Sequence, residues 1–236
     1  MRRNLLPILS ILLCWSLAWT ANGLELVAPG GGEMDLQKNI VKYYGTDSKP
    51  VEARWNEMVL QTSYLEYYRE QEIIKGKNGV NLVQNQPEKR TLKSLEATID
   101  LRREFFTATK EVFLTLRDDT TIHSGLMEWD QKKDEVRFNL KPLIHYQQWR
   151  ITGDSIIGNP NKGLFTVYGP VVATNDEIKI KAGKVIFNRE LEHLILKEEP
   201  ILIKGDNQLT ATEIIYNLKT EKVTAQGVVK TKIIKE

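Results

Sequence analysis

The chain has 236 residues, of which 41% are hydrophobic and 8% aromatic, and 33 Lys and Arg against 31 Asp and Glu give a formal charge of +2. A chain of this length can bury a hydrophobic core in one or two domains. The near balance of charge argues against a dedicated nucleic-acid-binding protein, which would carry a basic excess. The single Cys excludes an intrachain disulfide framework and a thiolate zinc site.

Residues 1–23 have the layout of a secretory signal peptide. Arg2 and Arg3 form a basic start, an apolar run extends from Leu5 to Trp19, and Ala21-Asn22-Gly23 places small residues at the −3 and −1 positions of a cleavage site. The alternative is a retained inner-membrane anchor. A spanning helix needs roughly 20 apolar residues, however, and this run is shorter and contains Pro7.

Cleavage after this segment would change the charge and the thiol content of the chain. Residues 1–23 hold two Arg, no acidic residue and the only Cys, Cys14. The remaining chain then has 31 basic and 31 acidic residues and a net charge of 0. A lipid-attachment site at Cys14 is disfavoured because Leu13 is too large to precede a lipidated Cys. An exported chain without Cys cannot use thiol chemistry.

Residues 24–50 are expected to form a linker or entry segment ahead of a domain over 51–236. The run Ala28-Pro29-Gly30-Gly31-Gly32 is typical of flexible chain. The sequence leaves open whether this segment joins the first sheet or forms a separate arm.

From residue 51 onward the pattern favours strands. Apolar and polar residues alternate over 95–102 and 178–183, the period of a half-buried strand. Thr, Val, Ile and Tyr dominate these runs, as a pleated surface prefers. Residues 51–61 fit either a short helix or a first strand.

A self-comparison shows a repeat of about thirty residues. In its clearest copies an apolar residue lies two positions before an anchor, and Asp or Asn then opens a polar turn. The anchors are Tyr67, Ile99, Trp129, Ile157, Phe187 and Tyr216, with separations of 32, 30, 28, 30 and 29 residues. Six such strand-turn-strand units predict a curved antiparallel sheet or an elongated double-layered roll.

The repeated pattern A-x-x-[I/V]-x-[aromatic]-[N/D] … [A/G]-x-G-V, behind a signal peptide, resembles the OstA/LptA-type β-jellyroll family. The clearest copy consists of Ala211, Ile214, Tyr216, Asn217, Ala225, Gly227 and Val228. A second copy runs over 65–82, and residues 140–181 fit poorly. The resemblance implies an all-β fold, namely an elongated antiparallel jellyroll that is open-ended and contains an apolar groove.

The same resemblance implies a non-enzymatic carrier in the periplasm of a diderm bacterium. Such a carrier holds the acyl chains of lipopolysaccharide, or of its lipid A part, between two sheets and passes them toward the outer membrane. The implied partners are other jellyroll proteins of the transport bridge, joined through edge strands, with head-to-tail self-association as a further expectation. One alternative is the membrane-anchored partner of the export ABC transporter, LptC, which shares the fold. The other is a structural envelope β-repeat protein with a closed core.

The apolar alternation supplies candidates for the groove lining, although the same residues could fill a closed core. The candidates are Ile99, Leu101, Val112, Leu114, Trp129, Phe138, Val167, Val185, Phe187, Leu196, Ile203, Ile214 and Tyr216. A last strand over 228–234 is expected to pair with a neighbouring molecule through its exposed edge. Its pairing candidates are Val228, Val229, Thr231 and Ile233.

Other chemistry finds little support in the sequence, and no cofactor or metal site is expected. His123, His145 and His193 are widely separated and none has a partner at ligand spacing. There is no nucleophile elbow, zinc-protease motif or nucleotide-binding loop. Lys132 and Lys133, and the group Lys179, Lys181 and Lys184, either meet lipid phosphates or form solvated sheet faces, and the solvated interpretation is favoured.

Overall fold

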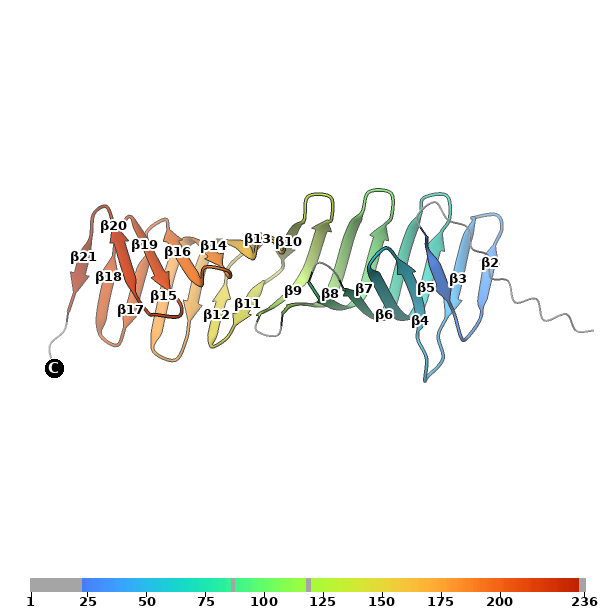
Figure 1. The fold of residues 1–236 in the computed structure, drawn as a ribbon, viewed down its shortest axis with the longest axis horizontal. Helices are drawn as coiled ribbons and strands as arrows, with labels where there is room; N and C mark the ends of the chain where they lie inside the picture. Colours follow the sequence, from blue (N-terminus) through green and yellow to red (C-terminus); the bar gives the residue numbers. More distant parts are fainter. Residues whose placement is uncertain (1–22, 86–87, 118–119, 234–236) are drawn as a thin grey trace, which may run out of the picture.

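The computed structural model describes residues 23–85, 88–117 and 120–233, which form strands and turns without a helix. The strand pairs among these residues are antiparallel, as the strand-turn-strand repeat predicted (Figure 1). In chain order the strands are β1 (Glu25–Val27), β2 (Gly32–Asp35), β3 (Ile40–Tyr44), β4 (Val51–Trp55), β5 (Met58–Tyr68), β6 (Ile73–Gln84), β7 (Arg90–Asp100), β8 (Phe105–Leu116), β9 (Thr120–Asp130), β10 (Glu135–Asn139), β11 (Leu143–Tyr146), β12 (Trp149–Thr152), β13 (Ser155–Asn159), β14 (Leu164–Thr174), β15 (Ile178–Asn188), β16 (His193–Lys197), β17 (Ile201–Lys204), β18 (Asn207–Thr210), β19 (Glu213–Asn217), β20 (Val223–Gln226) and β21 (Lys230–Lys232).

The long strands bend at their centres, and this bend divides the hydrogen-bonded network into two layers. The pairing register of β6 with β7, for example, shifts between Lys77 and Val80, so each strand contributes one half to each layer. In layer I the neighbours are β2–β3–β5–β6–β7–β8–β9–β10–β13–β14–β15–β16–β19–β20. In layer II they are β1–β4–β5–β6–β7–β8–β9–β11–β12–β14–β15–β17–β18–β21. The molecule is therefore an elongated two-layered roll (Figure 1).

The turns of layer I explain the thirty-residue repeat. An Asp or Asn at the end of one strand accepts a hydrogen bond from the backbone N–H three residues later, as Asp130 does from Lys133 at 3.2 Å and Asn188 from Leu191 at 3.0 Å. The fifth residue of each of these turns then adopts a left-handed conformation, for example Glu192 with φ 51°. The turn chemistry predicted from the sequence is confirmed.

The bends carry a second repeated signal. At several of the bends where the chain crosses from one layer to the other, two successive residues have a left-handed backbone. Examples are Lys110–Glu111, Leu140–Lys141 and Glu198–Glu199, with φ between 55° and 64°. Left-handed backbone at residues other than Gly is costly and therefore marks a required geometry. Here it turns the strand from one layer into the other.

Residues 24–50 are part of the roll rather than a linker ahead of it. Strand β1 pairs with β4 in layer II, and β3 pairs with β5 in layer I. The ambiguous stretch 51–61 forms β4 and the start of β5. Both layers thus begin before the domain boundary expected at residue 51.

The register of β13 corrects one predicted anchor. Ile157 faces outward, opposite Arg137 and Thr166, whereas the neighbouring Gly158 faces the buried interior. Gly158 lies 29 residues after Trp129 and 29 before Phe187, so it occupies the anchor position of its repeat. A Cβ at Gly158 would lie only 2.1 Å from the ring of Phe165, which takes the space that an anchor side chain fills elsewhere.

Candidate functional site

The space between the layers contains nearly all the predicted lining residues. Of the thirteen candidates, all but Leu101 and Ile203 are buried in one hydrophobic core cluster that runs along the roll. The buried ones are Ile99, Val112, Leu114, Trp129, Phe138, Val167, Val185, Phe187, Leu196, Ile214 and Tyr216. Their burial places them in the interior. It is compatible with a groove whose walls they form around a lipid and equally with a closed core.

Two candidates lie elsewhere. Ile203 is on the outer face of layer II, opposite Lys179 on one side and Gln208 on the other, because the inward position of β17 belongs to Leu202. Leu101 lies in a turn at the margin of the core, where it is partly buried. The prediction that Ile203 lines the interior was wrong, because β17 is apolar at three successive positions and its facing cannot be read from hydrophobicity.

Aromatic rings join the two layers across the interior. Trp55 of layer II stacks on Phe106 of layer I, with ring centroids 6.2 Å apart. Further along, the ring of Trp149 meets Tyr216 edge-on at 5.3 Å. Such pairs are favourable beyond the area they bury. In the described residues the interior is packed with side chains.

Three polar atoms lie inside this apolar interior without a hydrogen-bond partner among the described residues. They are the indole Nε1 of Trp129, the indole Nε1 of Trp149 and the hydroxyl of Tyr216. Burial also raises the pKa of Tyr216, which keeps the hydroxyl protonated and able to donate. A buried donor without an acceptor costs about 1–3 kcal/mol. The interior therefore offers donors suited to an acceptor-bearing ligand.

On the side opposite the bends, turns of layer I face turns of layer II along an edge that we call the seam. At its centre Arg90 of layer II donates to Asp134 of layer I at 3.3 Å and to the side chain of Asn161. The guanidinium lies 5.7 Å from the centre of the Trp129 ring. Burial lowers the pKa of Arg90, and the carboxylate of Asp134 opposes this effect.

A second group of charges closes the seam nearby. Arg189 of layer I, with 3% of its side chain exposed, donates to Glu88 of layer II at 3.4 Å and to Glu190 at 2.9 Å. Arg117 bridges the same two carboxylates. Its hydrogen bond lowers the pKa of Glu88, against the opposing effect of burial. Sequence reasoning missed these residues because each resembles an ordinary charged turn residue and its partner is far away in the chain.

The ends of the roll expose strand edges. Among the described residues, β20 at the carboxyl-terminal end pairs only with β19 and β21 only with β18, so within that part of the chain each has one edge without a partner strand. Of the predicted pairing residues, Thr231 lies in β21, whereas Val228 and Val229 precede it and Ile233 follows it. At the other end β1 and β2 each have a single partner strand within the described ranges. The side chains of Val228, Val229 and Ile233 are 71%, 46% and 69% exposed.

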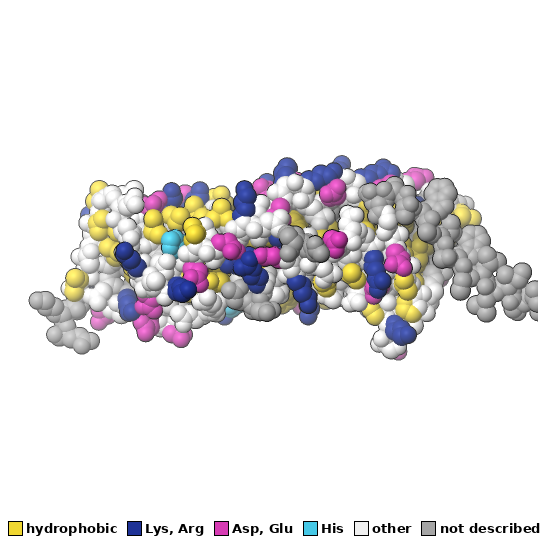
Figure 2. Space-filling model, viewed as in Figure 1, with side chains coloured by type: hydrophobic (Ala, Val, Ile, Leu, Met, Phe, Trp, Pro, Cys, Tyr) yellow, Lys and Arg dark blue, Asp and Glu magenta, His cyan; other side chains and the backbone are white. Residues whose placement is uncertain are grey.

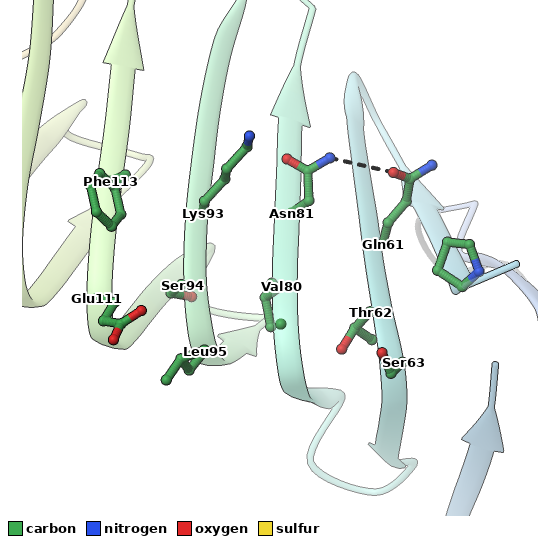
Figure 3. Close-up of a pocket in the computed structure, with 12 residues that line it drawn as sticks. Gln61, Thr62, Ser63, Val80, Asn81, Lys93, Ser94, Leu95, Glu111 and Phe113 are labelled. Atoms are coloured by element: carbon green, nitrogen blue, oxygen red, sulfur yellow. Dashed lines mark hydrogen bonds between the residues drawn. The ribbon is translucent and has the colours of Figure 1, made fainter. Parts of the chain in front are cut away.

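A hollow of about 470 Å³ opens on the outer side of layer II near the bends (Figure 3). Its wall includes Gln61, Asn81, Lys93 and Phe113 from four neighbouring strands, and the Asn81 amide donates to Gln61 at 3.3 Å. The hollow lies outside the two layers and is separate from the interior.

The outer face of layer I carries an isoleucine row. Ile186, Ile195 and Ile215 are cross-strand neighbours on β15, β16 and β19, and Ile157 continues the row through Thr166. Figure 2 shows hydrophobic side chains gathered over this part of the molecule, in the left half of the view. These four isoleucines are half-buried.

The histidines form no metal centre in the described part of the chain. His123 and His145 lie close on the outer face of layer II, with ring centroids 5.3 Å apart, and His193 lies on layer I. No group of three metal-ligating side chains exists among the described residues. Within those residues there is also no helix of the length and apolarity needed to span a membrane.

No protein-family model matches the sequence, and no curated protein matches it at a significant level. Among solved structures, the chain aligns with the crystal structure of LptH, "the LptA homologous periplasmic component of the conserved lipopolysaccharide transport device from Pseudomonas aeruginosa". The TM-score is 0.47 and the sequence identity 13%, and the alignment covers 51% of this chain and 98% of that one.

Proposed function

We propose that this protein is a non-enzymatic periplasmic carrier for lipopolysaccharide, which holds acyl chains between the two layers and passes them toward the outer membrane. The observation that carries the proposal is the continuous apolar interior, bounded by bends on one side and by the polar seam on the other. Each acyl methylene transferred into such an interior contributes about 0.8 kcal/mol. The sequence pattern over 211–230 supports the same function.

The unpartnered donors favour lipids that carry hydrogen-bond acceptors over lipids that do not. The indole N–H groups of Trp129 and Trp149 and the hydroxyl of Tyr216 could donate to the ester, amide and hydroxyl oxygens near the head of acylated sugars. Plain hydrocarbon would leave these donors unpaired. Acyl chains that carry oxygen near the glycan are therefore the ligand class that this interior suits.

Loading requires the layers to separate, because side chains fill the interior. The bends cannot open without breaking strands, whereas the seam is held by side-chain contacts such as Arg90–Asp134 and Arg189–Glu88. We therefore assign entry to the seam or to the open ends. The free edges of β1, β2, β20 and β21 provide the surfaces for pairing with other jellyroll proteins or with a second copy.

Photo-crosslinking tests the carrier function. A benzophenone amino acid at Phe187, whose side chain is buried, should form an adduct with added lipopolysaccharide on illumination. The same probe at Ile186, the adjacent position that faces outward, is the matched control and should form none. A second buried probe at Tyr216, with circular dichroism of each variant, guards against a substitution that only disturbs folding.

The second candidate is a structural envelope β-repeat protein with a closed core. The packed rings of Trp55, Phe106, Trp149 and Tyr216 favour it, because they join the layers directly. Folded variants with probes at both 187 and 216 and no lipid adduct at either would establish this function and overturn the carrier.

The anchored LptC-like alternative concerns residues 1–22, which lie outside the described residues. Amino-terminal sequencing of the exported protein separates it from the soluble carrier. A mature start near Leu24 supports the soluble carrier, and an intact Met1 supports the anchored partner.

A further inference from the structure

The carboxyl-terminal half of layer II has an outer face made of two cross-strand rows. We call this surface the basic face, and its strands are β12, β14, β15, β17, β18 and β21. One row consists of Thr152, Val172, Lys181, Ile201, Thr210 and Lys230. The other consists of Arg150, Thr174, Lys179, Ile203, Gln208 and Lys232.

The two rows of the basic face carry five basic side chains, from Arg150, Lys179, Lys181, Lys230 and Lys232. Neither row contains an Asp or Glu, and the lysines of β15 and β21 form no ion pair among the described residues. Layer I differs, since Lys77 pairs with Glu66 at 3.4 Å and Lys197 with Glu213 at 2.8 Å. In the carboxyl-terminal half, Lys197 on the outer face of layer I is therefore paired, whereas the lysines of the two rows are not. At the margin of the rows, Lys204 of β17 pairs with Glu177 at 2.8 Å.

The size and shape of the basic face indicate an extended occupant. Five strand spacings separate β12 from β21, which is roughly 24 Å at about 4.8 Å each. Side chains on one face of a sheet point in parallel directions and do not converge on a single small anion. Because a sheet twists from strand to strand, only neighbouring strands present side chains toward one flat surface. An occupant would therefore contact these six strands and not the whole of layer II.

Apolar side chains lie between the charges. Val172, Ile201 and Ile203 face outward and are half-buried beside Lys179 and Lys181. Lysines with apolar neighbours on one surface suit the boundary of a lipid bilayer, where cations meet phosphates and apolar groups meet the acyl region. Nucleic-acid recognition would favour exposed aromatic residues for stacking, and the two rows have none.

We propose that the basic face docks the protein on an anionic phospholipid bilayer. The contact is peripheral and electrostatic, and it holds the carboxyl-terminal half of the roll against the membrane surface. This docking does not depend on lipid transport, because the basic face lies outside the layers and the interior does not contribute to it.

Vesicle flotation of the exported protein tests the proposal. Vesicles of phosphatidylcholine with about one third phosphatidylglycerol should carry the protein upward, and pure phosphatidylcholine should not. The variant Lys179→Gln/Lys181→Gln should lose roughly tenfold or more in binding. The matched control Lys132→Gln/Lys133→Gln removes the same charge from a layer I turn and should bind as the wild type does.

Three results would overturn the docking. One is equal binding to both kinds of vesicle, and another is an equal loss in the two double variants. The third is a wild-type protein that binds lipopolysaccharide micelles but not phosphatidylglycerol vesicles, with the micelle binding lost in Lys179→Gln/Lys181→Gln. That result would assign the basic face to the phosphates of the cargo. Raising the salt from low to physiological ionic strength should weaken genuine docking.

Discussion

Arg189, in the turn between β15 and β16, donates a hydrogen bond to Glu88, 101 positions earlier in the chain and in the other layer. The guanidinium is almost fully buried, whereas about a third of the carboxylate side chain is exposed. This contact fastens the seam between parts of the chain that no local pattern connects.

Removal of the Arg189 guanidinium should destabilise the protein. Arg189→Met removes the buried donor that Glu88 and Glu190 share and leaves the half-exposed Arg117 as their common partner, so we expect a loss of about 1–3 kcal/mol in urea unfolding. Arg137→Met removes an exposed guanidinium, bonded to Glu135 at 2.8 Å, and should change stability by less than about 0.5 kcal/mol. Equal losses in the two variants would contradict a special role for the seam.

The seam should also make stability depend on pH. The pKa of Glu88 is lower in the folded protein than its ordinary 4.5, so its contribution is present above that value and is lost as the pH falls through the folded pKa. Unfolding free energy should therefore decline between roughly pH 5 and pH 3, and less steeply in Glu88→Gln. Glu128→Gln, on the outer face of layer I, is the control and should follow the wild-type profile.

Gly158 should not tolerate a methyl group. In Gly158→Ala the new Cβ would lie 2.1 Å from the Phe165 ring, and we expect a loss of about 1–3 kcal/mol by thermal or urea unfolding. Adding Phe165→Leu should recover part of the loss, because the smaller side chain makes room. A Gly158→Ala protein with wild-type stability would show that β13 faces the other way.

The bend at Glu198–Glu199 stores backbone strain that Gly would relieve. Glu199 has a φ of 59°, so Glu199→Gly should be neutral or stabilising by up to about 1 kcal/mol, even though Gly raises the entropy of the unfolded chain. Glu199→Val should destabilise by about 1 kcal/mol, since a β-branched residue fits this conformation poorly. Differential scanning calorimetry of the two variants distinguishes these outcomes, and a less stable Gly variant would argue against strain.

The proposed pairing of end strands predicts concentration-dependent self-association. Val229→Lys/Ile233→Lys places charges beside the free edge of β21 and should weaken association roughly tenfold or more in sedimentation experiments. Leu191→Lys changes an exposed residue in a turn away from both ends and should have no effect. A wild-type protein that stays monomeric at high concentration would contradict head-to-tail self-association.

The sequence predicted the repeat and its turns well because both depend on local chemistry. An Asn or Asp that accepts from its own backbone, as Asn217 does from Thr220, needs no distant partner. Strand facing was harder to predict. Ile157 and Ile203 looked like interior residues, yet the register turns both outward. In a run of successive apolar residues a one-residue change of register reverses every side chain.

The seam could not be predicted at all. Arg90 meets Asn161, 71 positions later, because two layers must close on each other before these side chains approach. The sequence shows only charged turns, which are usually solvated. Long-range pairing of this kind requires the folded geometry.

Because each strand bends from one layer into the other, the number of repeat units sets the length of the roll. Each thirty-residue unit supplies two strands to each layer, so it extends the roll by roughly 10 Å at the usual strand spacing. A unit contacts mainly its immediate neighbours, as in other linear repeat proteins. Deletion or duplication of one whole unit, cut at equivalent left-handed residues such as Glu104 and Asp134, should therefore yield a shorter or longer roll with the same cross-section.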